Sequence, residues 1–180
     1  MDAFDAFTDV NESNWFYYYV AWAHDAGLVM GDRGRFRPND QITREQFAAM
    51  LARTTSGEID SWGLSVLTHD AEAVSDWAGR YVGLIYHLGW MVGDNHGNFN
   101  PRDQITRGEV ATAVNRILGR VACRETLAAA DIENQGSANQ FPDVAETAWY
   151  FPAVLGAGND HSLIRNGTTG AVNWMRIVVE

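Results

Sequence analysis

An internal repeat is the feature of this sequence that most limits its fold. The stretch FRPNDQITREQF begins at Phe36, and FNPRDQITRGEV begins at Phe99, sixty-three residues later. Each stretch holds a proline turn, a Thr-Arg pair and the start of a run with helical apolar spacing. A unit written twice in this way predicts a repeat protein, in which neighbouring units bury one another's apolar faces.

The first half of each repeat predicts an amphipathic helix. Apolar residues recur at helical spacing, and these stripes are Trp15, Tyr19, Trp22, Ala23 and Ala26 in the first copy and Trp77, Tyr81, Leu84, Ile85 and Leu88 in the second. We expect each stripe to be the buried face of its helix. Gly27 and Gly89 follow, where a helix ends in a left-handed residue.

The second half of each repeat predicts a capped helix. Thr43 and Gln46 match the capping box, a Thr followed three residues later by Gln or Glu, and so do Thr106 and Glu109. Each repeat therefore reads as helix, glycine turn, short extended piece, proline turn and helix. The expected fold class is all-α.

A Gly-Asp pair stands in the turn of each repeat. Gly31 and Gly93 are expected to adopt positive φ, with a close approach of ligand to the backbone as the alternative. Asp32 and Asp94 follow them, and their carboxylates either cap the turn or accept hydrogen bonds from a ligand's hydroxyl groups.

A third copy begins and then departs from the pattern. FPDVAETAWY at 141–150 echoes FTDVNESNWF at 7–16, and Trp149 takes the place of Trp15. When the Gly-Asp block is omitted, 163–175 aligns on 105–117, which predicts a second helix and puts Arg165 in the place of Arg107. The expected divisions are repeat 1 at 1–56, repeat 2 at 57–120, a linker or extra helix at 121–140, and a degenerate repeat 3 at 141–180.

The charge balance limits the partners of this chain. Lys plus Arg is 13 and Asp plus Glu is 23, so the formal net charge is 13 − 23 = −10. Such an acidic chain is a poor partner for nucleic acid or anionic lipid, and an anion must be held by locally placed Arg. The sequence has no apolar run of the roughly 18 residues that a membrane span needs, so membrane insertion is not expected.

Metal and thiol chemistry find little support in the residue pattern. Counting Asp94 as the first position of a calcium loop places Phe99 where an EF-hand needs Gly and Ile105 where it needs Glu. Cys123 is the only cysteine, which rules out an intrachain disulfide. No cofactor and no metal site are expected, and the sequence indicates no oligomeric state.

The repeated Asp-x5-Trp lead-in, Gly-Asp turn and Ile-Thr-Arg helix start resemble the S-layer homology family. The resemblance covers nearly the whole chain, in two good copies and one degenerate copy. It implies three helix-turn-helix repeats packed with pseudo-threefold symmetry. It also implies grooves between repeats that bind a secondary cell-wall polysaccharide, which often carries pyruvate, and a location on the bacterial cell surface. The family's Thr-Arg-Ala-Glu motif falls on 43–46 and 106–109, and neither copy is the consensus.

The resemblance also implies candidate binding residues. Arg44 and Arg107 stand beside helix N-termini, where a guanidinium could hold a carboxylate in a bidentate pair. A salt bridge to a nearby carboxylate (Asp32, Asp40, Asp94 or Asp103) is the structural alternative. Trp15, Trp77 and Trp149 are expected to anchor the core, with stacking on a sugar face as the alternative. In the third copy the position belongs to Arg165, and Thr and Glu are both missing there.

These patterns favour a non-catalytic anchoring module over an enzyme. No phosphate loop, nucleophile elbow or zincin motif is present. The alternative from another class is a structural or protein-interaction module that keeps the architecture without binding sugar. The closing run RIVVE has no helix cap after it, which favours a fragment of a longer secreted protein.

Overall fold

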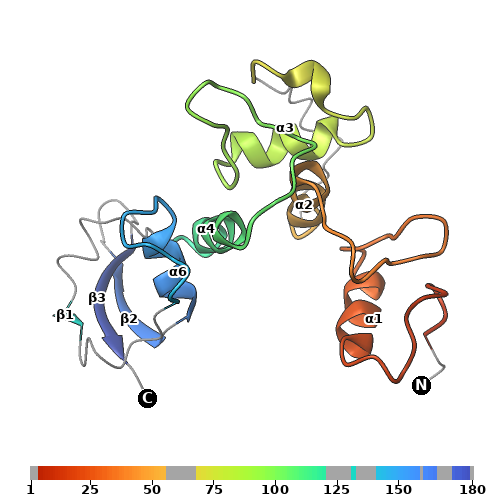
Figure 1. The fold of residues 1–180 in the computed structure, drawn as a ribbon, viewed down its shortest axis with the longest axis horizontal. Helices are drawn as coiled ribbons and strands as arrows, with labels where there is room; N and C mark the ends of the chain where they lie inside the picture. Colours follow the sequence, from red (N-terminus) through yellow and green to blue (C-terminus); the bar gives the residue numbers. More distant parts are fainter. Residues whose placement is uncertain are drawn as a thin grey trace. The chain divides into compact units, whose positions relative to one another are not determined.

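The computed structural model describes most of both predicted repeats and part of the C-terminal third of the chain (Figure 1). The described residues are 4–55, 68–120, 131–132, 141–158, 160–165 and 172–178. They belong to two compact units, Met1–Ile105 and Thr106–Glu180. The predicted linker at 121–140 lies outside the described residues, apart from 131–132.

The first unit holds the first repeat and the first helix of the second. Its elements are α1 (Tyr17–Asp25), α2 (Arg44–Ala52), the 3-10 helix η2 (Ala71–Ala73) and α3 (Gly79–His87). Gly27 has φ 70° and Gly89 has φ 68°, just past the ends of α1 and α3. Both predicted left-handed glycines are therefore confirmed, because a residue without Cβ enters this region without strain.

The predicted capping boxes are present in both repeats. The Thr43 hydroxyl accepts from the Gln46 amide, and the Gln46 side chain accepts from the Thr43 amide at 2.8 Å. Thr106 and Glu109 make the same reciprocal pair at the start of α4 (Arg107–Ile117), which begins the second unit. Each box satisfies donors that a helix N-terminus otherwise leaves free.

The predicted buried face of α1 is wrong. Tyr17 and Val20 are each 5% exposed and pack in a core cluster with Phe7, Val10 and Val29. The large members of the predicted stripe face solvent instead: Trp15 is 83%, Tyr19 71% and Trp22 67% exposed, whereas the small Ala23 packs against the core cluster. The helix carries aromatic residues on both faces, so periodicity alone could not choose between them.

The predicted buried face of α3 is largely confirmed. Tyr81, Leu84 and Ile85 are buried, and α3 packs against α2. Trp77 and Leu88, at the two ends of the stripe, are 49% and 38% exposed. The second helix of repeat 1 thus covers the first helix of repeat 2.

The all-α prediction is wrong for the C-terminal third of the chain. A sheet forms there from β1 (Asp131–Ile132), which precedes α6 (Phe151–Gly158), and from β2 (Asp160–Arg165) and β3 (Val172–Val178), which follow it. β3 lies between the others, parallel to β1 and antiparallel to β2. The helix predicted within 163–175 is therefore absent from the described part of that segment, and the VNWMRIV sequence of β3 is rich in β-branched and aromatic residues that favour strands.

The turns before α6 repeat those before α1. Amide-to-carbonyl bonds join Val10 to Phe7, Asn14 to Asn11 and Tyr17 to Asn14 in the first copy. At an offset of 134 residues, the same bonds join Val144 to Phe141, Ala148 to Ala145 and Phe151 to Ala148. In addition, α6 packs against α4 as α3 packs against α2. Residues 141–158 thus show the same turns, followed by a helix, as the start of the first repeat.

Candidate functional site

The N-terminus of α2 is closed by backbone carbonyls of the second repeat. The Arg44 amide donates to the Asp103 carbonyl at 2.9 Å, and the Glu45 amide donates to the Pro101 carbonyl at 2.9 Å. Thr43 forms an isolated β-bridge with Gln104 beside them. The free amides of a helix N-terminus are the groups that attract an anion. Because the amides of Arg44 and Glu45 already have acceptors, they are not available to a ligand.

The Arg44 side chain is buried in the first unit and binds backbone carbonyls. Its Nε donates to the Phe99 carbonyl at 2.8 Å and its Nη2 to the Val92 carbonyl at 2.9 Å. The guanidinium carbon lies 4.9 Å from the centre of the Phe99 ring, in a cation–π arrangement. With 8% of the residue exposed, Arg44 ties the start of α2 to the Gly-Asp turn of the second repeat.

Arg107 has the same motif position and a different environment. Its side chain is exposed at the start of α4. Among the residues that the structure describes, none accepts a hydrogen bond from the amides of Arg107 or Gly108, whereas the two equivalent amides of α2 both have acceptors. The α4 terminus therefore combines an exposed cation with the Arg107 N–H, which has no acceptor among the described residues, and this chemistry is suited to an anion; Gly108 itself is buried.

Aromatic residues lie beside the α4 terminus. A Cβ on Gly108 would come within 2.7 Å of the Tyr150 ring, so this glycine is what allows the turn before α6 to pack there. The neighbouring Trp149 ring lies 5.4 Å from the Tyr150 ring and is 62% exposed. At the matching position of α2, Glu45 accepts from the amide and hydroxyl of Ser75 instead.

The two Gly-Asp turns use their glycines differently. Gly31 has φ 64°, as predicted, and a Cβ there would overlap the Phe7 ring. Gly93 does not have a left-handed φ, so that prediction is wrong. A Cβ on Gly93 would come within 2.6 Å of the Asn98 carbonyl oxygen, so close backbone packing explains why this position is glycine.

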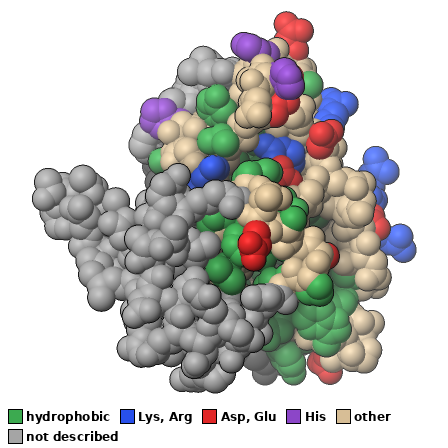
Figure 2. Space-filling view, turned by 60° about the vertical axis from the view of Figure 1, so that its left-hand side comes forward, with side chains coloured by type: hydrophobic (Ala, Val, Ile, Leu, Met, Phe, Trp, Pro, Cys, Tyr) green, Lys and Arg blue, Asp and Glu red, His purple; other side chains and the backbone are tan. Residues whose placement is uncertain are grey.

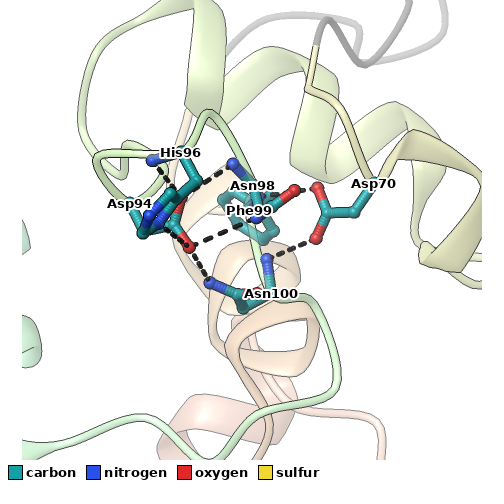
Figure 3. A network of polar contacts seen from close by, with 6 residues as sticks. All are labelled: Asp70, Asp94, His96, Asn98, Phe99 and Asn100. Carbon is teal, nitrogen blue, oxygen red and sulfur yellow. Dashed lines mark hydrogen bonds and ion pairs between the residues drawn. The ribbon is translucent and has the colours of Figure 1, made fainter.

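The aspartates of these turns bind groups within their own loops. The Asp94 carboxylate accepts from the amides of His96 and Asn98 at 2.8 and 3.0 Å and from the Asn100 side chain at 3.1 Å (Figure 3). The Asn98 amide, followed by the Asn100 side chain, lowers the pKa of Asp94 well below its ordinary value. In the first repeat, Asp32 pairs with Arg37 at 2.9 Å. Loop capping, one of the two expected roles, is thus observed for Asp94.

Two lead-in aspartates have structural roles that the sequence reading missed. Asp70 accepts from the amides of Phe99 and Asn100, both at 2.7 Å (Figure 3). Asp9 accepts from those of Phe36 and Arg37, both at 2.8 Å. Their signal in the sequence was the Asp at the same place in each lead-in. Burial raises the pKa of Asp70, but the bonds from Phe99 and Asn100 outweigh it and leave the pKa lowered.

The three lead-in tryptophans are exposed, so their predicted role as core anchors is wrong. Trp15, Trp77 and Trp149 are 83%, 49% and 62% exposed, and each lies two residues before the start of its helix. Arg165 ends β2 and pairs with Val172, so it does not start a helix. Of the predicted site residues, the described contacts join Arg44 to the turn that contains Gly93 and Asp94.

The described residues limit two further classes of site. No group of three metal-ligating side chains (His, Cys, Asp or Glu) gathers among them. In the same part of the chain, no helix is long and apolar enough to cross a membrane.

The fold and the caps define a protein of repeated helix-turn-helix units joined by Gly-Asp turns. The sequence profile of the S-layer homology domain matches residues 6–48 and 68–111. The chain belongs to the S-layer homology domain family through these two repeats.

Longer proteins contain segments similar to this chain. Cell surface glycoprotein 1 of Acetivibrio thermocellus is 28% identical over 166 residues, 88% of this chain and 7% of that protein. Amylopullulanase of Thermoanaerobacterium thermosulfurigenes is 32% identical over 62% of this chain and 6% of its own length. The Surface-layer 125 kDa protein of Lysinibacillus sphaericus is 29% identical over 64% and 10%, respectively. The chain therefore spans a small part of each of these relatives.

Proposed function

We propose that this chain is a non-catalytic cell-surface anchoring module that binds an anionic cell-wall polysaccharide. The observation that carries the proposal is Arg107, an exposed guanidinium at the open N-terminus of α4. A carboxylate on a sugar, such as a pyruvate substituent, would accept a bidentate pair from Arg107. The Arg107 amide at the start of the helix would add to that attraction.

The aromatic residues beside α4 suit the sugar that carries the anion. Trp149 is exposed next to Tyr150, whose ring packs against Gly108. An exposed indole presents an apolar face to sugar C–H groups and an N–H to their hydroxyls. We infer that Trp149 stacks on the sugar whose charge Arg107 holds.

We infer different roles for the two motif arginines. The guanidinium of Arg44 donates to the carbonyls of Val92 and Phe99, so Arg44 acts by holding the repeats together. The anionic site is then the one at Arg107, and avidity from two matching grooves is not expected. On the face drawn in Figure 2, the described acidic and basic side chains are interspersed, which fits an anion recognised by a local cation.

We infer that residues 141–158 are the first half of a third repeat, which takes its place by packing α6 on α4. The matching turn bonds before α1 and α6 support this. Because strands follow α6, this repeat has no second helix in the described part of the chain, and Arg165 has no helix terminus to act with. The full pseudo-threefold assembly of the family is accordingly not proposed for this chain.

Co-sedimentation with cell-wall sacculi tests the anchoring function. We expect the chain to pellet with untreated walls and to stay in solution after the non-peptidoglycan polymer is removed. Arg107→Ala should weaken pelleting about tenfold or more, because a charged hydrogen-bonded pair is lost. Arg33→Asn removes one exposed cation from a loop of the first repeat and should leave binding unchanged.

The structural alternative makes a different prediction for the same assay. The buried Arg44 favours it, since one of the two motif arginines serves the fold. If the chain does not pellet with walls, or if Arg107→Ala pellets as well as the parent chain, the anionic polysaccharide site is wrong. A structural or protein-interaction module then becomes the better assignment.

A further inference from the structure

Helix α1 presents a row of aromatic side chains to solvent. Trp15, Tyr18, Tyr19 and Trp22 are 83%, 73%, 71% and 67% exposed, and we call these four residues the aromatic platform. Tyr18, Tyr19 and Trp22 lie on one side of the helix and Trp15 lies in the turn just before it, while Tyr17 and Val20 are buried on the other side. Such a run of exposed rings is unusual on a surface, where large apolar groups mark binding sites.

The second repeat shows what these positions look like when a helix covers them. At an offset of 62 residues, Tyr81 and Leu84 match Tyr19 and Trp22. They are 8% and 2% exposed because α2 packs on α3, and the Arg53 guanidinium lies 5.1 Å from the Tyr81 ring centre. The covered position thus holds an aliphatic Leu where the exposed one holds a Trp.

The chemistry of the platform fits a sugar chain better than a helix. Every member is aromatic and carries a polar hydrogen, from a phenol or an indole, so each ring offers an apolar face with a hydrogen-bonding edge. A pyranose presents the complementary surface, with a face of C–H groups and hydroxyls at its rim. A partner helix would be matched by aliphatic side chains, as at Leu84.

Charge selects a neutral glycan. The platform contains no Lys or Arg, and the exposed charged residues that flank it in sequence, Glu12 and Asp25, are acidic. An anionic polymer or an anionic membrane surface would meet no cation there. This separates the platform from the proposed Arg107 site, which is cationic.

The spacing of the rings suits a linear chain. The Trp15 and Tyr19 ring centres are 6.4 Å apart and their planes are inclined at 62°, so the two rings would contact different sugars. Tyr18 and Trp22 are one helical turn apart, about 6 Å along the axis. Successive sugars of an extended glycan could therefore lie over successive rings.

We propose that the aromatic platform binds a neutral, linear polysaccharide by stacking. This binding surface is additional to the proposed anion-binding site at Arg107 and does not depend on it. A wall-anchored chain with both surfaces would hold two chemically different glycans.

Titration of the full chain with neutral oligosaccharides tests this assignment. The probes are hexamers of β-1,4-linked N-acetylglucosamine and of β-1,4-linked glucose, followed by calorimetry and tryptophan fluorescence. We expect saturable binding of at least one hexamer, with little change between low and high salt. The double substitution Tyr19→Ala and Trp22→Ala should weaken it about tenfold or more, since each stacked ring contributes up to about tenfold.

Matched controls separate this proposal from the others. Met30→Ala removes another exposed apolar side chain of the first repeat and should leave hexamer binding unchanged, as should Arg107→Ala. Circular dichroism should show unchanged helix content in the double variant, because both residues are exposed. The double variant should still pellet with walls through Arg107.

Two results would overturn the assignment. One is failure of both hexamers to bind, or binding that the double substitution does not weaken. The other is concentration-dependent self-association of the chain in ultracentrifugation that the double substitution abolishes, without hexamer binding. The second result would make the platform a protein interface.

Discussion

Arg44 and Arg107 occupy the same motif position, and replacing each with Ala should have opposite consequences. In Arg44→Ala, the carbonyls of Val92 and Phe99 lose donors at 2.9 and 2.8 Å, and the stacking on the Phe99 ring is lost. A buried acceptor left without a partner costs about 1–3 kcal/mol. The cation–π contact adds about 0.5–2 kcal/mol. We expect the free energy of unfolding to fall by about 3 kcal/mol or more.

Arg107→Ala should leave stability nearly unchanged. Its side chain is exposed, and substitutions at such positions usually change the free energy of unfolding by less than about 0.5 kcal/mol. Chemical denaturation followed by circular dichroism measures both variants. Arg44→Lys is the control for charge: lysine keeps the cation but lacks the planar fork, so it should recover only part of the lost stability.

The reasoning fails if the two arginines behave alike. Equal stability of Arg44→Ala and Arg107→Ala would show that the carbonyl contacts of Arg44 contribute little. If Arg44→Ala kept its stability and lost wall binding, Arg44 would be a ligand-binding residue and its assignment to the fold would be wrong.

Three further substitutions test the packing and the loops. Gly108→Ala should destabilise the second unit by about 1 kcal/mol, because overlap with the Tyr150 ring exceeds the gain in helix propensity; Tyr150→Ala in the same chain should remove that penalty on thermal unfolding. Asp70→Asn should lower stability at neutral pH, and since the pKa of Asp70 is lowered by folding, the difference from the parent should fade as pH falls below about 4 in denaturant titrations. Arg37→Asn should raise the melting temperature, because Arg37 has φ 58° and Asn adopts left-handed φ at less cost.

The helix caps and the glycines that end the helices were predictable because they depend on contacts within a few residues. The capping boxes at Thr43 and Thr106 join residues three apart, and Gly27 ends its helix by its own lack of a Cβ. These signals hold in any packing arrangement. The helix α6 was predictable for the same reason, since the turns before it are local.

The buried face of α1 could not be read from the sequence. Aromatic residues lie on both faces, and the choice of Tyr17 over Trp15 depends on the cluster around Phe7, which comes from the preceding loop. The strands that follow α6 escaped prediction because the third copy was assumed to continue like the second. Strand β3 is stabilised by its neighbours in the sheet, and no local sequence pattern identifies those neighbours.

The sequence by itself determined the family and the starts of α2 and α4, because the repeated motif rests on local hydrogen bonding and backbone conformation. Only the tertiary structure decided what each arginine does. Arg44 meets the carbonyls of a turn nearly fifty residues away, brought there by packing of α2 on α3. Arg107 begins α4, which packs against α6. In the described residues no such turn follows α6, so the guanidinium of Arg107 stays at the surface. The two Thr-Arg motifs differ in environment because the carbonyls that Arg44 meets come from a distant turn, whereas the described residues supply no such acceptor to Arg107.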